Sequence, residues 1–237
     1  MPNPCAVVTG GARNIGQAIA LRLQLDGYRV IVLDIETPQA ASLQADAHVV
    51  DLSDIDATQQ VLETIANTQP VTCLVNNVGI VRPAMLEEAN LEDFDLLMHL
   101  NVRSALMCTQ ALLPAMRAQG HGRIVMNASR VVLGKEARTL YSATKGALQA
   151  MARTWALELA ADGITVNCVA PGPIATTAFW ENNPPDSAQA RRIIDNIPVQ
   201  RMGTPEDVAN AVSFFCAPES SFVTGQTLFV CGGVTVG

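Results

Sequence analysis

The chain has 237 residues, of which 49% are hydrophobic and 16% are charged, and its formal net charge is -7. This length fits one larger domain, and the composition is that of a globular protein with a well-buried core rather than of a disordered chain. An acidic balance without any basic cluster argues against nucleic acid or an anionic membrane as the main partner, so we expect a small-molecule ligand.

Short β-branched runs alternate with longer helical patterns along the chain. The predicted strands cover residues 5–10, 29–34, 47–52, 71–77, 122–129, 164–172 and 225–233. The first predicted helix starts at about residue 14, and a short one follows the second strand. The other predicted helices cover residues 54–68, 91–117 and 140–161. This alternation predicts one α/β domain with a doubly wound, Rossmann-type parallel sheet of about seven strands and helices on both faces. Residues 171–198, which contain several prolines, are expected to form an elaborated loop.

The first predicted strand runs directly into a glycine-rich turn. Gly10, Gly11 and Gly16 separate this strand from a helix with apolar residues at positions 15, 19 and 23. Such a turn exposes backbone amides at a helix N-terminus, where an anion such as a pyrophosphate is favoured. The second strand ends in Asp34, 18 residues beyond Gly16, where a carboxylate can accept hydrogen bonds from ribose hydroxyls. Turn and acid together predict a dinucleotide site.

Tyr141 and Lys145 form a second candidate site, in a chain that has only two tyrosines and two lysines. Their spacing places both on one face of a helix, where an ammonium can act on a phenol. A phenol with an ordinary pKa of about 10 is a poor base near neutrality, and a nearby ammonium would favour the phenolate. The pair is therefore either a proton-handling site or a chance pairing on an amphipathic helix.

These motifs, in this order, resemble those of the short-chain dehydrogenase/reductase family along essentially the whole chain. The family's nucleotide motif T-G-x-x-x-G-x-G is matched by Thr9, Gly10 and Gly16, with Asn14 in place of the middle glycine. Because asparagine tolerates unusual backbone angles and caps helices, we expect the turn to keep its form.

Three further segments resemble cofactor-binding motifs of the same family. The pair Asp51 and Leu52 is similar to its adenine-contacting pair after the third strand. The segment NNVG at 76–79 resembles its N-N-A-G motif, and APGPIATT at 170–177 resembles the segment that holds the nicotinamide carboxamide. The cofactor-binding residues that the resemblance implies are Gly10, Arg13, Asn14, Ile15, Gly16, Asp34, Asp51, Leu52, Asn77, Gly79, Tyr141, Lys145, Pro171, Gly172, Ile174 and Thr176.

The family's catalytic tetrad of Asn, Ser, Tyr and Lys is matched by Asn101, Ser129, Tyr141 and Lys145. By this resemblance, Ser129 would orient the substrate oxygen and Tyr141 would be the general acid or base. Asn101 would hold a water that relays protons from Lys145, whose compact ammonium would also reach the nicotinamide ribose. Ser129 and Tyr141 are 12 positions apart where the family commonly has 13, which predicts a shorter intervening loop.

The resemblance implies an NAD(P)-dependent oxidoreductase that interconverts a secondary alcohol and a ketone. Two alternatives are a catalytically inactive, dinucleotide-binding regulatory protein and an epimerase or dehydratase on the same scaffold. The loop between Ser129 and Tyr141 contains Arg130, Lys135 and Arg138, and Arg82 follows the turn NNVGI. Either an anionic substrate or ordinary solvated loop charges would explain them.

Two residues predict opposite cofactor preferences. Arg13 lies in the glycine-rich turn, where related enzymes that use NADP often have a basic residue. Asp34 would accept hydrogen bonds from the free ribose hydroxyls of NAD and would repel a 2′-phosphate. Because that repulsion is hard to avoid and Ile35 supplies no second positive charge, we expect NAD to be preferred over NADP.

The resemblance also implies a homotetramer and a substrate lid. The family pairs its fourth and fifth long helices across a two-fold axis, and the corresponding helices here have apolar residues all round. The lid is expected at residues 175–199, which include Phe179 and Trp180.

The remaining signals concern location and metals. The start MPNPCAVVTGG has no basic leader, and no later stretch approaches the roughly 20 apolar residues of a membrane span, so we expect a cytoplasmic protein. The six cysteines lack C-x-x-C spacing and are expected to serve as small hydrophobic residues. The three histidines have no partners at metal-ligand spacing, so no metal site is expected.

Overall fold

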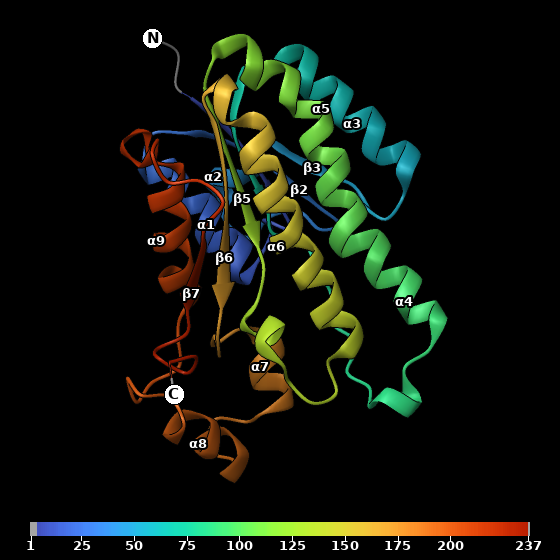
Figure 1. The fold of residues 1–237 in the computed structure, drawn as a ribbon, viewed down its shortest axis with the longest axis vertical. Helices are drawn as coiled ribbons and strands as arrows, with labels where there is room; N and C mark the ends of the chain where they lie inside the picture. The colour runs from blue at the N-terminus through green and yellow to red at the C-terminus, as the bar shows by residue number, and fades with distance from the viewer. Residues whose placement is uncertain (1–3, 237) are drawn as a thin grey trace.

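The computed structural model describes residues 4–236, and within them seven parallel strands form one sheet. The strands are β1 (Cys5–Thr9), β2 (Arg29–Asp34), β3 (Ala47–Val49), β4 (Val71–Asn76), β5 (Gly122–Asn127), β6 (Ile164–Pro171) and β7 (Thr227–Val230). Their order is β3-β2-β1-β4-β5-β6-β7, so the chain reverses direction across the sheet between β1 and β4 (Figure 1). The predicted doubly wound, Rossmann-type fold in a single domain is confirmed.

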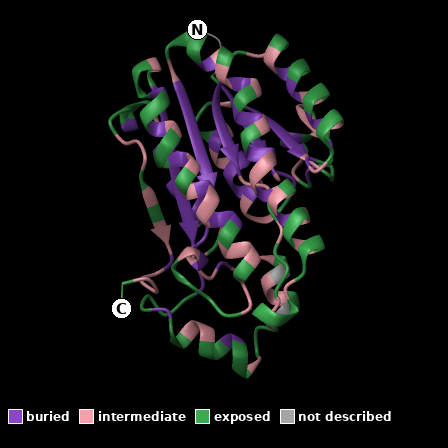
Figure 2. Ribbon diagram, turned by 45° about the vertical axis from the view of Figure 1, so that its right-hand side comes forward, coloured by how far each residue is buried: buried purple, intermediate pink, exposed green. Residues whose placement is uncertain are grey.

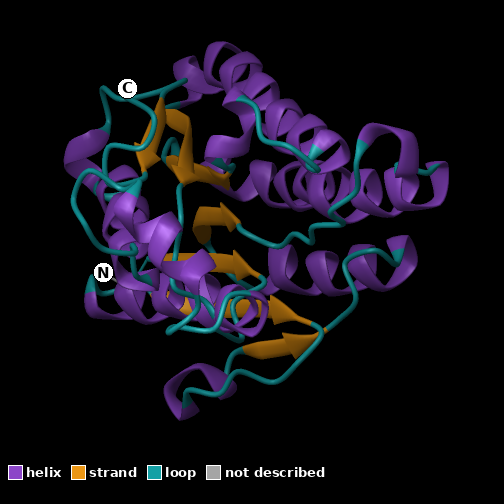
Figure 3. Ribbon diagram, turned by 90° about the horizontal axis from the view of Figure 1, so that it is seen from below, coloured by secondary structure: helices purple, strands orange, loops and turns teal. Residues whose placement is uncertain are grey.

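Helices cover the sheet on both sides (Figure 3). They are α1 (Asn14–Leu25), α2 (Ala41–Gln44), α3 (Ile55–Thr68), α4 (Leu91–Met98), α5 (Ser104–Gln119), α6 (Thr139–Leu159), α7 (Thr177–Asn182), α8 (Ala188–Asp195) and α9 (Pro205–Cys216). α1 and α9 pack together on one face, and α3, α5 and α6 pack on the other. α7 and α8 lie beyond the carboxyl ends of the strands, at the bottom of Figure 1.

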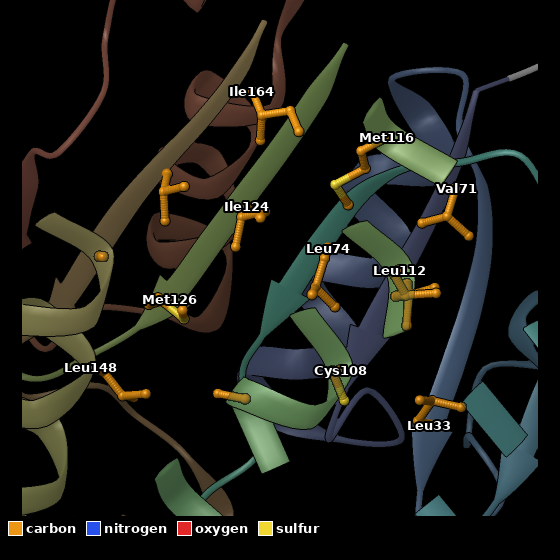
Figure 4. Close-up of a cluster of buried hydrophobic side chains, with 14 of the residues drawn as sticks. Leu33, Val71, Leu74, Cys108, Leu112, Met116, Ile124, Met126, Leu148 and Ile164 are labelled. Carbon is orange, nitrogen blue, oxygen red and sulfur yellow. The ribbon is translucent and has the colours of Figure 1, made fainter. Parts of the chain in front are cut away.

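β1, β4, β5 and β6 in the middle of the sheet are buried on both faces, as the purple ribbons in Figure 2 show, whereas β3 and β7 at its edges are half-buried to exposed. Side chains that alternate along β1 enter different cores, because successive residues of a strand point to opposite faces. Cys5 and Val7 join the cluster under α3, α5 and α6, part of which Figure 4 shows, whereas Ala6 and Val8 join the cluster under α1 and α9. A parallel sheet with both faces covered explains the nearly continuous apolar runs in the sequence.

The predicted helix over residues 91–117 is interrupted in the structure. α4 ends at Met98, a π-helical turn spans His99–Arg103, and α5 begins at Ser104. A π turn widens the helix by one residue and is frequent at functional sites. The turn contains Asn101, whose side chain bonds the backbone of Ile80 in the loop after β4, a tertiary contact that the periodic pattern of the sequence does not include.

Two further helical regions were not predicted from the sequence pattern. α9 begins with a capping box in which Thr204 and Asp207 satisfy each other's backbone N–H groups, and Pro205 occupies its first turn. α7 and α8 lie inside the stretch that was expected to be only a loop. The other predicted helices agree with α1, α3 and α6 to within about two residues.

The six cysteines, at positions 5, 73, 108, 168, 216 and 231, are all buried free thiols, as expected for small hydrophobic residues. Within residues 4–236, no helix is long and apolar enough to cross a membrane. Over the same residues, no group of three His, Cys, Asp or Glu side chains is arranged to hold a metal ion.

Candidate active site

The glycine-rich turn between β1 and α1 has the backbone form that its sequence requires. Gly10 has a φ of 64°, and a Cβ atom at Gly16 would collide with the Gly10 carbonyl oxygen. Asn14 adopts a φ of 49°, so asparagine replaces a glycine here without loss of the left-handed conformation, as predicted. Its side chain does not cap α1. Instead, Asn14 Oδ1 accepts hydrogen bonds from the backbone N and the hydroxyl of Thr177, both at 3.1 Å.

Asp34 lies at the end of β2 beside the glycine-rich turn. Its Oδ2 accepts a hydrogen bond from Ala12 N at 2.8 Å, and its Oδ1 accepts one from Glu36 N at 3.3 Å. Arg13 forms an exposed ion pair with Glu36 at 3.2 Å rather than with Asp34. The carboxylate is therefore held against the turn, and the guanidinium stands next to it at the rim.

Asn77 ties β4 to the glycine-rich turn. Its Nδ2 donates to the carbonyl oxygens of Thr9 and Gly10 at 3.0 and 2.9 Å, and its backbone N donates to Thr9 Oγ1 at 3.0 Å. Asn127 Nδ2 at the end of β5 donates to Asn77 Oδ1 at 2.7 Å. The ends of three neighbouring strands are therefore cross-linked by side chains.

Tyr141 and Lys145 lie one turn apart near the start of α6, as their spacing predicted. The Lys145 ammonium is 5.6 Å from the centroid of the Tyr141 ring. Lys145 is 2% exposed, and its Nζ donates to the Asn127 carbonyl oxygen at 2.7 Å. A fully buried lysine without a carboxylate partner is costly, which is a common feature of functional sites.

Burial is the largest influence on the pKa of both side chains. It raises the pKa of Tyr141 from 10.0 to about 12, although the Ser129 hydroxyl and the Arg138 charge both lower it. It lowers the pKa of Lys145 from 10.5 to about 8. The expected lowering of the tyrosine pKa by Lys145 is not found, because removal from water acts more strongly on the phenol than the neighbouring charges do.

Asn101 is buried in the π turn, and its side-chain amide makes three hydrogen bonds. Its Oδ1 accepts from Ile80 N at 2.9 Å, while its Nδ2 donates to Ile80 O at 2.9 Å and to Thr144 Oγ1 at 3.1 Å. The side chain thus fixes the loop after β4 against α6. These bonds use both amide N–H groups of Asn101, so a water held by this side chain, as the resemblance implied, could bond only to the remaining acceptor position of Oδ1.

Two cavities meet at Tyr141. A cleft of about 480 Å³ runs from the glycine-rich turn to Lys145, and a cavity of about 310 Å³ lies beyond Ser129. Tyr141, Asn127, Ile15 and Thr176 line both of them. A molecule in the cleft and a second molecule in the cavity would therefore touch the same phenol.

The structure gathers most of the predicted cofactor residues around the cleft. Its lining includes Gly10, Arg13, Asn14, Ile15, Gly16, Asp34, Asp51, Leu52, Asn77, Gly79, Tyr141, Lys145 and Thr176. The other three, Pro171, Gly172 and Ile174, line the adjoining cavity instead. Of the predicted catalytic residues, Tyr141 and Lys145 line the cleft, Ser129 lines the cavity, and Asn101 lies behind the wall that Gly79 forms.

The residues of the cleft fit a nicotinamide dinucleotide. A Cβ at Gly79 would lie 3.2 Å from both Asn101 Oδ1 and Lys145 Nζ, so glycine leaves room above these polar groups. Asn127 lines both cavities, and its buried Oδ1 has no hydrogen-bond partner among the described residues. An unpaired buried acceptor costs free energy that a donor on a bound ligand would recover.

Asn127 is the main site residue that the sequence analysis did not single out. It bonds Asn77 with its side chain and Lys145 with its carbonyl oxygen. The available signal was a polar residue at the carboxyl end of a buried strand, two positions before Ser129. Phe179 and Ile193, from the expected lid, also line the cavity.

Comparisons with known proteins cover nearly the whole chain. A family model described as Enoyl-(Acyl carrier protein) reductase matches residues 10–235. The chain is 36% identical to a (2S)-[(R)-hydroxy(phenyl)methyl]succinyl-CoA dehydrogenase subunit of Thauera aromatica, over 98% of this chain and 96% of the relative.

Two solved structures superimpose closely on this chain, and each alignment covers 99% of it and 97% of the other protein. One, from Beutenbergia cavernae, is assigned as an NAD(P)-dependent gluconate 5-dehydrogenase and holds NADP at low occupancy; it is 33% identical, with a TM-score of 0.89. The other, from Agrobacterium tumefaciens, is assigned as a 2-deoxy-D-gluconate 3-dehydrogenase with bound NADP; it is 31% identical, with a TM-score of 0.89.

The predicted preference for NAD over NADP is wrong by this comparison, because both of these neighbours hold NADP. The prediction treated the Asp34 carboxylate as a free negative charge facing the ribose. In the structure both of its oxygens accept backbone N–H groups, from Ala12 and Glu36, which stabilise that charge locally. The exposed Arg13 guanidinium lines the same cleft as Asp34 and pairs with Glu36, a partner that a bound phosphate could replace.

Replacing Lys145 by methionine should stabilise the protein at neutral pH. The lowered pKa means that the charged Lys145 side chain destabilises the folded protein. The free energy gained by removing this charge should exceed the free energy lost with the Asn127 hydrogen bond by about 2 kcal/mol. The unfolded lysine keeps its proton up to a pH near 10.5, whereas the folded one loses it from about pH 8. The stability of the wild type should therefore rise relative to Lys145→Met between these values.

Urea unfolding of both proteins at pH 7 and at pH 10 measures this difference. We expect the advantage of Lys145→Met at pH 7 to shrink at pH 10. A variant that is less stable than the wild type by the same amount at both pH values would show that the buried ammonium carries no penalty.

Proposed function

The chain belongs to the short-chain dehydrogenase/reductase family, and from this premise we propose that it interconverts a secondary alcohol and a ketone with a nicotinamide cofactor. The observation that carries the proposal is the position of Tyr141 at the junction of the two cavities, with Ser129 and Lys145 beside it. A phenol there can reach a substrate oxygen while the cleft holds the cofactor.

When bound, the nicotinamide supplies hydride transfer to or from the carbinol carbon. The chain supplies the proton and the geometry. The Ser129 hydroxyl, on the cavity wall, donates a hydrogen bond to the substrate oxygen and so orients it toward Tyr141. Tyr141 Oη gives a proton to that oxygen during ketone reduction and takes one from it during alcohol oxidation.

The electrostatics of the site favour the acid form of Tyr141. With a pKa raised to about 12, the phenol is neutral near pH 7, which is the form that donates a proton. Donation leaves a phenolate, which the hydrogen bond from the Ser129 hydroxyl and the Arg138 charge stabilise. We therefore propose that this site favours catalysis of ketone reduction over catalysis of alcohol oxidation.

The proposed cofactor is NADP(H). Its support is the NADP held by the two solved neighbours, together with Arg13 at the rim of the cleft. The residues that would hold the dinucleotide are those of the glycine-rich turn around its pyrophosphate, Asp51 and Leu52 around adenine, and Lys145 at the nicotinamide ribose. The Arg13 guanidinium would pair with the 2′-phosphate in place of Glu36.

We also propose that residues 175–199 act as a lid. Phe179 and Ile193 of this segment line the cavity, and Thr177 is held by the Asn14 side chain of the glycine-rich turn. A segment that touches both binding spaces is suited to close over a substrate after the cofactor is in place.

The proposed assembly is a homotetramer. Its support is the apolar surface on the helices that face solvent, where Leu106 of α5 is 37% exposed and Leu157 of α6 is 86% exposed. Large apolar side chains on outward helix faces are typical of subunit interfaces.

Replacing Tyr141 by phenylalanine should lower kcat by at least about 100-fold and leave the dissociation constant for NADP(H) within about twofold. The change removes the proton donor but almost none of the surface that borders the cleft. Turnover is followed by nicotinamide absorbance with a panel of ketones, and binding by calorimetry. Activity within a few-fold of the wild type would remove Tyr141 from the mechanism.

Replacing Arg13 by serine should reduce kcat/KM for NADPH by about tenfold and leave kcat/KM for NADH nearly unchanged. The lost interaction is a charged contact to a phosphate that only NADPH has. The matched variant Asp34→Ser should instead lower kcat/KM for NADH, since its carboxylate can bind only free ribose hydroxyls. A wild type that is faster with NADH, and insensitive to Arg13→Ser, would overturn the assignment to NADP(H).

Light scattering should return a mass about four times that of the 25.2 kDa chain. Leu157→Glu places a charge on the exposed face of α6 and should lower this mass, because burying an unpaired carboxylate in an interface is unfavourable. A wild type with the mass of one chain at micromolar concentration would contradict the proposal.

A further inference from the structure

Three cationic side chains converge on the cavity beside Ser129 and Tyr141. Arg130, Lys135 and Arg138 all line this space of about 310 Å³, and none of the side chains that line it is acidic. All three come from the short segment between the two proposed catalytic residues. The segment between Ser129 and Tyr141 therefore makes the cavity that would hold a substrate positively charged.

None of the three cations has a carboxylate partner within residues 4–236. The ion pairs of these residues involve other arginines, including Arg82, which pairs with Asp93 at 3.6 Å. The Arg138 guanidinium donates to the Ala137 carbonyl oxygen at 2.8 Å, a contact that leaves its charge uncompensated. The one acidic residue of the segment, Glu136, is exposed and forms no ion pair.

The three charges also oppose one another. Lys135 is exposed, but partial removal of its ammonium from water lowers its pKa, and the charges of Arg138 and Arg130 lower it further. Like charges held close together repel one another, which is unfavourable at short range. An anion among these side chains would relieve the repulsion, and two of them are arginines, whose planar fork binds a carboxylate through paired hydrogen bonds.

The opposite wall of the cavity is apolar, with Val81, Ile174, Phe179 and Ile193 among its residues. A cavity with cations on one wall and apolar side chains on the other suits a small molecule that has a hydrocarbon part and one acidic end. Arg138 precedes α6 and lies within one turn of Tyr141. A small molecule can therefore place an acidic group at Arg138 and a carbonyl oxygen, only a few covalent bonds away, at the Tyr141 hydroxyl.

We propose that the substrate is a small oxo acid or hydroxy acid whose carboxylate is bound by Arg130, Lys135 and Arg138. The inference rests on the proposed function and adds the substrate class to it. During reduction, a hydride adds to the carbonyl carbon and a proton from Tyr141 adds to the carbonyl oxygen, which gives the hydroxy acid. The carboxylate binds and orients the molecule and is chemically unchanged.

Matched pairs of ketones test this substrate class. Acetoacetate and levulinate carry a carboxylate, and their methyl esters have the same carbon chain and ketone without the charge. With NADPH in excess, we expect kcat/KM to be at least about tenfold higher for each acid than for its ester, mainly through a lower KM. Raising sodium chloride to about 0.5 M should reduce this ratio, since salt screens the cation–carboxylate attraction.

Charge-removing variants locate the carboxylate. Lys135→Gln and Arg130→Gln should each reduce the acid-to-ester ratio of kcat/KM by about tenfold, and Lys135→Arg should restore it. The matched control is Arg117→Gln, which removes the same charge from an exposed residue at the C-terminal end of α5, away from the cavity, and should leave the ratio unchanged. Esters reduced as efficiently as acids, or equal losses for acid and ester in these variants, would overturn the inference.

Failure of the proposed function is a separate outcome. If none of the four ketones changes the nicotinamide absorbance, calorimetric titration of levulinate and methyl levulinate into the protein loaded with NADP⁺ decides the inference alone. Levulinate binding that weakens about tenfold in Lys135→Gln would support the carboxylate site in a protein without this activity. Equal binding of acid and ester would overturn it.

Discussion

A chain of buried and partly buried hydrogen bonds from Lys145 to the glycine-rich turn holds the two halves of the site in one geometry. Lys145 Nζ donates to Asn127 O at 2.7 Å, Asn127 Nδ2 to Asn77 Oδ1 at 2.7 Å, and Asn77 Nδ2 to Gly10 O at 2.9 Å. This chain joins α6 to the ends of β5, β4 and β1, on both sides of the point where the strand order reverses. Because an unpaired polar group away from water is costly, these bonds favour one arrangement of the strand ends, and only Asn127 Oδ1 is left as an acceptor without a partner among the side chains of this network.

The same burial sets the electrostatics of the site. Removal from water lowers the pKa of Lys145 and raises that of Tyr141. A neutral phenol therefore lies next to an ammonium group whose charged form is destabilised by burial. The positive charges that reach the substrate side come instead from Arg138 and its neighbours in the loop. Arg138 of the loop that connects Ser129 to Tyr141 both lines the cavity and lowers the pKa of Tyr141, so under the proposed substrate class this loop would link substrate binding to the acidity of the tyrosine.

The fold was largely predictable because its signals are local. Apolar runs of strand length alternating with helical patterns predicted the parallel sheet, and Gly10, Gly16 and Asp34 predicted the turn and the strand end beside it. The errors also have a local explanation. The apolar pattern over residues 91–117 is typical of a regular helix throughout. In the structure, hydrogen bonds between Asn101 and Ile80, 21 positions away, accompany a π turn that this pattern does not reveal.

By itself, the sequence determined the fold class and the residue types of the site, because glycine turns, strand ends and the Tyr141–Lys145 spacing depend on neighbours along the chain. Only the tertiary structure decided that Asn127 joins the site, that the amide of Asn101 bonds Ile80 and Thr144, and that three loop cations share one cavity. It also showed that burial, rather than Lys145, dominates the pKa of Tyr141. These properties depend on contacts between segments up to tens of residues apart and on exclusion of water, which a linear pattern does not encode.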